Sequence, residues 1–376
     1  MYANAPLIGA PGGRARLDTP ALVVDLPALK RNISRMAALA QARGIALRPH
    51  VKSHKSARIA RLQIDAGAHG VSCATLGEAQ VMVDAGIRGV LVTSPVVGEH
   101  KVHRLVELAR KAGPRAVMAV VDHPDNVAEL ASAAASLAFP LGVLIDYHAG
   151  YGRTGVTDEH AALALAKRIG EAAPLALRGL QAYGGNLQHI GERAQREAAA
   201  AALRARIVKI VETLQAAGIE LEIVTGVGTG THDIDSSDEV FTEMQVGSYV
   251  FMDAEYAQVL SAASDTRFET SLFVQSTVVS VNAPDWVTVD AGIKSFATDS
   301  GIPLAARGID GPSQYAFFGD EHGKLVVDAP HRPTLGAHIE FVAPHCDPTV
   351  NLHQVYHIVD GDTLVGIWPV DARGHF

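Results

Sequence analysis

Cysteine and aromatic residues are scarce in this sequence of 376 residues, and long apolar runs are absent. Two cysteines, Cys73 and Cys346, cannot form a disulfide framework, so we expect a reducing cytoplasm as the location. No apolar run reaches the ~18 residues of a membrane-spanning helix, and the N-terminus lacks the continuous apolar core of a signal peptide. The 32 basic residues are outnumbered by 40 acidic ones and form no basic stripe. These absences argue against nucleic acid or a membrane as partner.

Apolar residues are plentiful at 48%, enough for a large core and for about two domains. From about residue 20 to residue 251, short apolar runs alternate with amphipathic segments such as 30–43, 99–111, 159–173 and 193–217. This alternation predicts parallel βα units whose sheet is covered by helices. Nine runs are one more than a (β/α)8 barrel uses, so we expect the first run, residues 21–26, to belong elsewhere.

The pattern changes near residue 268, where strand-like, β-branched runs separated by Gly, Pro or Asp turns replace the helical segments. We therefore predict an α/β (β/α)8 TIM barrel at residues 27–262 and a C-terminal all-β domain at residues 263–376. The N-terminal segment 1–26 is expected to add a strand to the β-domain. The natural boundary is the segment 256–267.

The most informative stretch is LRPHVKSHK at residues 47–55, at the C-terminal end of the first predicted barrel strand. Strand periodicity would put His50, Lys52 and His54 on one side. Burial in the barrel mouth would lower the pKa of Lys52 and free its amine for a Schiff base with a carbonyl or with pyridoxal phosphate. Alternatively, these side chains are solvated, or the two histidines bind the metal of a hydrolase, which the lysine between them opposes.

Residues 225–231 read TGVGTGT and follow the seventh predicted barrel strand, where this architecture usually binds phosphate. Glycines let backbone N–H groups converge on an anion, although such a loop could also be only a tight turn. The spacing matches neither a P-loop nor a dinucleotide fingerprint. Further polar side chains follow other barrel strands and could share one site, namely Arg153, Gln181, Tyr183 and His189.

The C-terminal segment PHCDPTVNLH begins with imidazole, thiol and carboxylate in a row. Extended backbone would send His345 and Asp347 to one face and Cys346 to the other. The imidazole and carboxylate suit Mn²⁺ or a similar ion better than a thiolate zinc site. The alternative is a Pro-flanked turn with a buried His–Asp hydrogen bond.

Taken together, these motifs resemble the D-threonine aldolase group of the fold-type III pyridoxal phosphate enzymes, which also include alanine racemase and eukaryotic-type D-serine dehydratase. The resemblance extends over nearly the whole chain, through LRPHVKSHK, VTGVGTGT, EMQVGSYVFMDAEY, VDAGIKSFATDSGIP and PHCDPTVNLH. It implies an alanine-racemase-like barrel with a β-domain, a homodimer, and pyridoxal 5'-phosphate together with a divalent metal. Mn²⁺ is the first expectation for the metal, with Mg²⁺, Co²⁺ or Zn²⁺ as alternatives.

The resemblance also implies roles for individual residues. Lys52 would form the Schiff base, and His189 would be the base on the substrate hydroxyl. The remaining roles are cofactor binding by Arg153, Gln181, Tyr183, Gly228, Thr229 and Gly230, and metal binding by His345 and Asp347.

The expected activity is the retro-aldol cleavage of D-3-hydroxy amino acids of the D-threonine type to glycine and an aldehyde. A 3-hydroxy-D-aspartate aldolase would share the same motifs. A dehydratase of D-serine or 3-hydroxyaspartate is a further alternative, although dehydratase relatives favour His-x-Cys where this chain has His345-x-Asp347. More distant alternatives are a non-enzymatic pyridoxal phosphate carrier, which would resemble the barrel alone, and the metal hydrolase.

Overall fold

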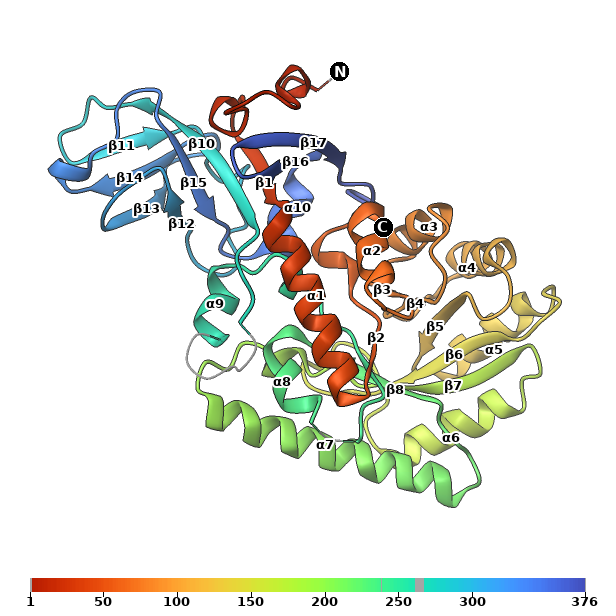
Figure 1. The fold of residues 1–376 in the computed structure, drawn as a ribbon. Coiled ribbons are helices and arrows are strands. Elements are labelled where there is room, and N and C mark those ends of the chain that lie inside the picture. Colours follow the sequence, from red (N-terminus) through yellow and green to blue (C-terminus); the bar gives the residue numbers. More distant parts are fainter. Residues whose placement is uncertain (1, 238, 261–266, 376) are drawn as a thin grey trace.

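Eight short parallel strands form the barrel of the computed structural model, which describes residues 2–237, 239–260 and 267–375 (Figure 1). Their order is β2-β9-β8-β7-β6-β5-β4-β3, and a bridge between His50 and Ser72 joins the two ends, so that the barrel is nearly closed. The strands are β2 (Ala46–Leu47), β3 (Val71–Cys73), β4 (Val90–Val92), β5 (Val117–Val121), β6 (Leu141–Asp146), β7 (Leu175–Gln181), β8 (Ile223–Val227) and β9 (Glu243–Met244).

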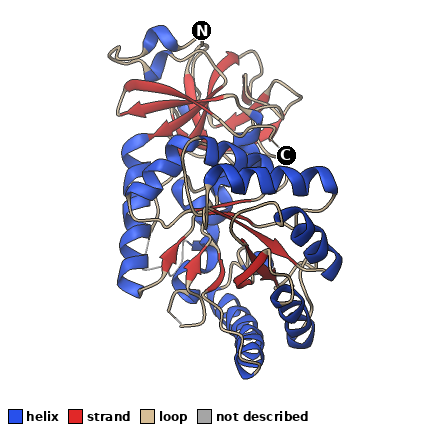
Figure 2. Ribbon diagram, turned by 90° about the vertical axis from the view of Figure 1, so that its right-hand side faces the viewer, coloured by secondary structure: helices blue, strands red, loops and turns tan. Residues whose placement is uncertain are grey.

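Helices surround these strands, as Figure 2 shows. They are α1 (Leu26–Arg43), α2 (Ala57–Asp65), α3 (Leu76–Asp84), α4 (Glu99–Ala112), α5 (Pro124–Ala134), α6 (Glu159–Gly170), α7 (Arg193–Ala216), α8 (His232–Asp235) and α9 (Ala254–Leu260). Helix α4 illustrates why they form, because its buried residues Val102, Leu105, Val106 and Ala109 recur at the three- and four-residue spacing of one helix face. The four amphipathic segments predicted from sequence all fold as helices, with ends shifted by a few residues.

The second part is a mostly antiparallel sheet domain, drawn at the upper left of Figure 1. Its strands are β1 (Ala21–Asp25), β10 (Leu272–Ser280), β11 (Trp286–Val289), β12 (Leu304–Arg307), β13 (Ser313–Phe317), β14 (Gly323–Val327), β15 (His338–Val342), β16 (Val355–Asp360) and β17 (Thr363–Pro369). Strand β1 lies between β10 and β16, antiparallel to the first and parallel to the second. The predicted fold class is confirmed, and the first apolar run does belong to this sheet. The predicted boundary at residue 262 lies outside the described residues.

The two parts meet at the C-terminal end of the barrel. A short helix of the sheet domain, α10 (Cys346–Leu352), lies there (Figure 1). The buried carboxylate of Asp253 accepts hydrogen bonds from the backbone N–H groups of Tyr256 and Cys346, both at 2.9 Å. It thereby fixes the first turns of α9 and α10 together. The Tyr356 hydroxyl adds a buried hydrogen bond to the carbonyl oxygen of His54 at 2.5 Å.

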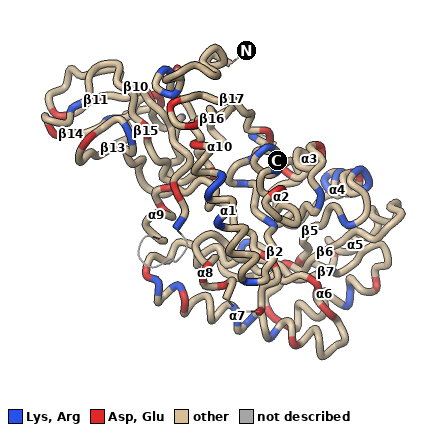
Figure 3. Tube along the Cα trace, in the orientation of Figure 1, with Lys and Arg blue, Asp and Glu red and all other residues tan. Residues whose placement is uncertain are grey.

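Acidic and basic side chains are interspersed over both parts of the molecule (Figure 3). In the part of the chain that the structure describes, no helix is both long and apolar enough to cross a bilayer.

Candidate functional site

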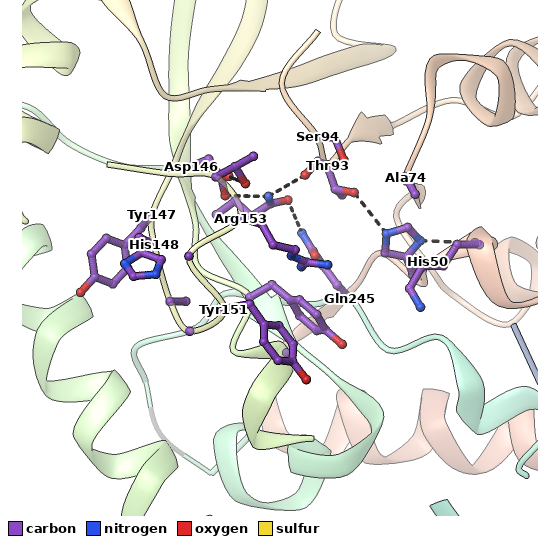
Figure 4. A pocket seen from close by; sticks show the side chains of 18 of the residues that line it. His50, Ala74, Thr93, Ser94, Asp146, Tyr147, His148, Tyr151, Arg153 and Gln245 are labelled. Atoms are coloured by element: carbon purple, nitrogen blue, oxygen red, sulfur yellow. Dashed lines mark hydrogen bonds between the residues drawn. The ribbon is translucent and has the colours of Figure 1, made fainter. Parts of the chain in front are cut away.

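A cavity of about 380 Å³ opens at the C-terminal ends of the barrel strands, facing the sheet domain (Figure 4). Most of the residues predicted to form the site line it, namely Lys52, Arg153, Gln181, Tyr183, His189 and His345. They come from segments that are far apart in the sequence, and the barrel together with the sheet domain brings them to one place. Asp347 lies just behind this lining, against Lys52, whereas residues 228–230 are not among the described residues that line the cavity.

Lys52 lies in a short 3₁₀ helix, Val51–Ser53, and not in a strand as expected. Strand β2 ends at Leu47, and the His50 side chain begins the 3₁₀ turn by accepting a hydrogen bond from the Lys52 N–H at 3.3 Å. The prediction that His54 shares a side with Lys52 is therefore wrong. His54 is fully buried behind the cavity, where its Nε2 bonds to Gln63 Oε1 at 3.2 Å.

The Lys52 amine forms an ion pair with the Asp347 carboxylate, across the junction of the two domains. Burial alone would lower the pKa of Lys52, but the charge of Asp347 outweighs it and raises that pKa above its ordinary value. The same pairing with Lys52 outweighs burial at Asp347 and holds its pKa well below the usual range. The predicted lowering of the lysine pKa is thus wrong for this arrangement, because the sequence did not indicate where Asp347 would lie.

The metal-like motif does not have the extended geometry expected of it. His345 caps the N-terminus of α10, and Cys346 and Asp347 already belong to the first turn of that helix. Cys346 is buried, and its Sγ lies 3.3 Å from Asp347 Oδ1. His345 nevertheless lines the cavity, and its Nδ1–H donates to Asp299 Oδ2 at 2.7 Å, which leaves Nε2 available as a ligand.

Two donors of these kinds, an imidazole nitrogen and a carboxylate oxygen, fit a divalent ion such as Mn²⁺. Water and substrate would have to supply its other ligands, as in an open catalytic site. Within the described ranges, no group of three or more His, Cys, Asp or Glu side chains is placed to hold a metal.

Gln181 lies at the centre of a hydrogen-bonded network on the cavity floor. Its partners Thr93, Asp146 and Gln245 are labelled in Figure 4. Its amide donates to Asp146 Oδ1 at 2.8 Å and to the Thr93 carbonyl at 2.9 Å, while its oxygen accepts from Gln245 at 3.2 Å. Burial raises the pKa of Asp146 although its hydrogen bonds with Thr154 and Gln181 oppose the rise. Such a fully bonded network holds the floor rigid beneath a ligand.

His50 belongs to the same floor, since its Nε2 bonds to Thr93 Oγ1 at 3.2 Å. Burial and the neighbouring Lys52 cation keep the pKa of His50 well below its ordinary value. Because Nδ1 accepts from the Lys52 N–H, the ring is a neutral imidazole that holds the lysine turn in place.

The glycine loop follows β8 as predicted and packs closely on Gln188. A Cβ added at Gly228 would lie 2.4 Å from Gln188 Oε1, and one at Gly230 would lie 2.2 Å from the Gln188 carbonyl oxygen. The N–H of Gly230 donates to Gln188 Oε1 at 2.8 Å. Thr229 is buried, and its hydroxyl has no partner among the described residues. An orphaned donor beside two glycines that admit no side chain fits a phosphate-binding loop.

Arg153 and Tyr151 lie on the loop between β6 and α6, at the cavity rim (Figure 4). The Arg153 guanidinium lies over the Tyr151 ring, 5.6 Å from its centroid. The Tyr151 ring also approaches Gly185, where an added Cβ would lie 2.8 Å from it. The loop thus carries a cation and an exposed aromatic ring to the opening, where an anionic ligand would enter.

His189 lies at the rim with its Nδ1 2.7 Å from Glu255 Oε1. Its ring also contacts that of Tyr256, with centroids 5.5 Å apart. Sequence reasoning did not single out Glu255 or Asp299, although both lie in the motif-rich segments DAEY and ATDSG. Spacing in the sequence alone could not pair these two carboxylates with His189 and His345.

Comparison with known proteins gives matches along nearly the whole chain. A family profile described as the alanine racemase N-terminal domain matches residues 24–255, and one described as a putative serine dehydratase domain matches residues 271–359. A D-threonine aldolase of Arthrobacter sp. is 38% identical, with 96% of this chain and 94% of that protein covered. A 3-hydroxy-D-aspartate aldolase of Paracoccus denitrificans (strain Pd 1222) is 36% identical, with 96% and 93% covered.

A D-threo-3-hydroxyaspartate dehydratase of Delftia sp. (strain HT23) is 31% identical over 94% of this chain and 97% of that protein. Among solved structures, the crystal structure of D-threonine aldolase from Filomicrobium marinum superposes with a TM-score of 0.91 at 38% identity, covering 96% of each chain. The match extends over both the barrel and the sheet domain.

Proposed function

Because this chain belongs to the D-threonine aldolase family, which is built on the alanine racemase barrel, we propose that it cleaves D-3-hydroxy amino acids to glycine and an aldehyde. The observation that carries the proposal is the convergence of Lys52, His189 and His345 on one cavity. The first comes from the barrel mouth, the second from the segment after β7, and the third from the sheet domain.

The family implies pyridoxal phosphate, and the cavity has residues that suit it. Lys52 would carry the cofactor, the loop at Gly228–Gly230 with the orphaned Thr229 hydroxyl would hold its phosphate, and Arg153 would lie beside its anionic ring oxygen. Gln181 and Tyr183 would border it from the floor and the wall. When bound, this group stabilises electron density at the α-carbon of an amino acid.

His189 would take the proton from the substrate β-hydroxyl at its Nε2, since Nδ1 lies against Glu255. The O–H electron pair becomes the C=O bond of the aldehyde, and the Cα–Cβ pair remains on the α-carbon, which a proton then converts to glycine. His345 and Asp347 would hold a divalent cation, which lowers the pKa of a coordinated hydroxyl. A second task of Asp347 is to hold Lys52, whose amine it contacts.

One assay separates the candidate reactions. Purified protein loaded with pyridoxal phosphate is given D-threonine, D-serine or 3-hydroxy-D-aspartate, each with Mn²⁺ and with a chelator, and glycine is measured against 2-oxo acid. We expect glycine in the presence of Mn²⁺ and little with chelator. If every substrate gave 2-oxo acid, the aldolase proposal would be wrong.

A 3-hydroxy-D-aspartate aldolase is the nearest alternative, supported by the 36% identical relative and by the exposed cation of Arg153 at the rim, which could meet a second substrate carboxylate. A dehydratase is supported by the 31% identical relative, and His345-x-Asp347 in place of His-x-Cys argues against it. A non-enzymatic carrier of pyridoxal phosphate is disfavoured because the sheet domain contributes His345 to the cavity.

The proposal also covers the metal, the oligomeric state and the location of the protein. Its metal would be Mn²⁺, for which the nitrogen and oxygen donors are suited. Exposed apolar side chains of the sheet domain, such as Phe318 and Leu335, support a homodimer. The two buried, unpaired cysteines support a cytoplasmic location.

A further inference from the structure

A loop of the sheet domain, residues 295–299, lies against helix α10 and contacts the helix and the residues at its two ends at three places. The His345 Nδ1–H donates to the Asp299 carboxylate at 2.7 Å. The Ala297 N–H donates to Thr349 Oγ1 at 3.0 Å. The His353 Nε2–H donates to the Ser295 carbonyl at 3.0 Å.

The spacing of these three contacts is regular. The contacting residues on and beside α10 lie four residues apart, and on the loop 295–299 they lie two residues apart in the opposite direction. The loop therefore follows the whole length of the short helix, with His345 and Asp299 as the last pair at the cavity.

The segment is anchored on its other side. Phe296 is almost completely buried and packs edge-on against Tyr315 and Phe341 of the sheet. Thr349 closes the link to the histidine, because its hydroxyl donates to the His345 carbonyl at 2.7 Å while accepting from Ala297. The backbone of His345 and the segment that carries Asp299 are thus held by the same buried hydroxyl.

The Asp299–His345 pair adds little to the stability of the fold, and its main effect is to orient the His345 ring. Asp299 is 51% exposed and His345 22% exposed, and ion pairs at such exposure add little to stability. A carboxylate on Nδ1, however, fixes both the ring plane and the tautomer of an imidazole, so that Nε2 presents its lone pair. His345 lines the cavity, so this lone pair belongs to the proposed metal site.

We propose that Asp299 is the positioning residue of the metal-binding histidine, holding His345 Nε2 toward the cation through a ladder of three contacts along α10. The inference rests on the proposed metal site and adds a residue to it. It also gives a role to His353, the last residue of the motif PHCDPTVNLH, which makes the contact farthest from the cavity.

The test measures Mn²⁺ affinity directly, by the electron paramagnetic resonance signal of free Mn²⁺ or by calorimetry, on the protein loaded with pyridoxal phosphate. We expect Asp299→Asn to weaken Mn²⁺ binding by about tenfold to a hundredfold, and Asp299→Glu to recover part of the loss. The thermal unfolding midpoint of Asp299→Asn should stay at that of the unmodified protein.

Glu255→Gln is the matched control, since it removes a carboxylate from another cavity-lining imidazole, that of His189, at the same 2.7 Å separation. It should leave Mn²⁺ affinity unchanged, whereas His345→Ala should abolish binding. Should Asp299→Asn fail to fold, Thr349→Val removes the middle contact, and we expect it too to weaken Mn²⁺ binding.

Mn²⁺ binding by Asp299→Asn as tight as that of the unmodified protein would overturn the inference while leaving the proposed function intact. Absence of Mn²⁺ binding in the unmodified protein would overturn both this inference and the metal part of the proposed function. Failure of the aldolase assay with normal Mn²⁺ binding would instead refute the activity alone.

Discussion

Two buried ion pairs lie at opposite ends of the barrel, and their cations are only four residues apart in the sequence. At the N-terminal end, Arg48 binds Glu243 through two hydrogen bonds of 2.7 and 2.8 Å, with both side chains at most 7% exposed. At the C-terminal end, Lys52 binds Asp347, with the lysine side chain 38% exposed. Both pairs bring one cation and one carboxylate together from distant parts of the chain.

The difference lies in what surrounds each pair. Arg48 and Glu243 come from neighbouring strand ends and are packed beneath Gly70 and Gly89, so close that a Cβ at Gly70 would lie 2.6 Å from the guanidinium. Lys52 and Asp347 come from two domains and border a cavity lined by histidines. The same kind of ion pair is therefore enclosed by backbone at one end of the barrel and borders the candidate site at the other.

The largest difference between the two ion pairs is expected when Lys52 is removed. We expect Lys52→Ala to lower kcat/KM on the order of 10³-fold or more, because the proposed covalent link to the cofactor is lost. The absorbance band of lysine-bound pyridoxal phosphate should disappear with it. The urea unfolding midpoint should fall less than that of Arg48→Met. If Lys52→Ala kept its turnover, Lys52 would not be the residue that binds the cofactor.

Removal of Arg48 tests whether the ion pair at the N-terminal end of the barrel contributes to stability. Arg48→Met should lower the free energy of unfolding by about 3–5 kcal/mol, because it leaves the Glu243 carboxylate buried without its partner. The double variant Arg48→Met/Glu243→Leu should recover most of this loss, and activity per folded molecule should be kept in both. The measurement is urea unfolding followed by circular dichroism.

Arg31→Ala is its matched control, since the Arg31–Glu269 pair has a similar 2.7 Å contact but side chains that are 51% and 36% exposed. There we expect a change of only about 0–1 kcal/mol. Equal losses of unfolding free energy for Arg31→Ala and Arg48→Met would mean that the Arg48–Glu243 pair does not owe its stabilising effect to its enclosure by backbone.

A pH-dependent effect is expected from His54, which lies buried behind the lysine turn. Burial lowers the pKa of His54 to about 4, despite the opposing hydrogen bond that its Nε2–H donates to Gln63 Oε1. Between pH 6.5 and 4 the unfolded chain therefore binds a proton that the folded protein does not, so stability is full above this window and falls as the pH drops through it. We expect a loss on the order of 3 kcal/mol at most from this residue.

Unfolding free energies at pH 7 and pH 4.5 measure this loss. His54→Gln should be less sensitive to pH than the unmodified protein, because the titrating ring is gone. His160→Gln, at a position whose side chain is 85% exposed, should keep the original pH dependence. An unchanged slope in His54→Gln would show that the ring is not kept neutral by its surroundings.

The barrel could be predicted from the sequence because its strands are continuous apolar runs and its helices carry one apolar face. The sequence has nine apolar runs where the barrel needs eight strands, so the first run was predicted to join the sheet domain. Strand β1 is observed there. Most of the site residues predicted from the sequence do line the cavity, since each follows a barrel strand or belongs to a motif shared with the family.

What failed were inferences that extended strand geometry beyond the strand. Strand β2 ends five residues before Lys52, so alternation predicted the wrong side for His54. Helix α10 begins immediately after His345, so Asp347 lies in a helical turn and not in the extended backbone that was expected. The raised pKa of Lys52 depends on a carboxylate nearly 300 residues away in the chain. Pairings of Glu255 with His189 and of Asp299 with His345 likewise exist only in three dimensions.

The position of β1 between β10 and β16 has a consequence for how the protein is made. Its residues are among the first to be synthesised, yet the strand that covers one of its edges begins only at Val355. Until then that edge remains open to mispairing, while the barrel between them can already close. Helix α10, which brings Asp347 to Lys52, directly precedes β16. A ribosome that stops before this point therefore releases a barrel whose cavity lacks His345 and Asp347, so the candidate site is complete only once almost the entire chain has been translated.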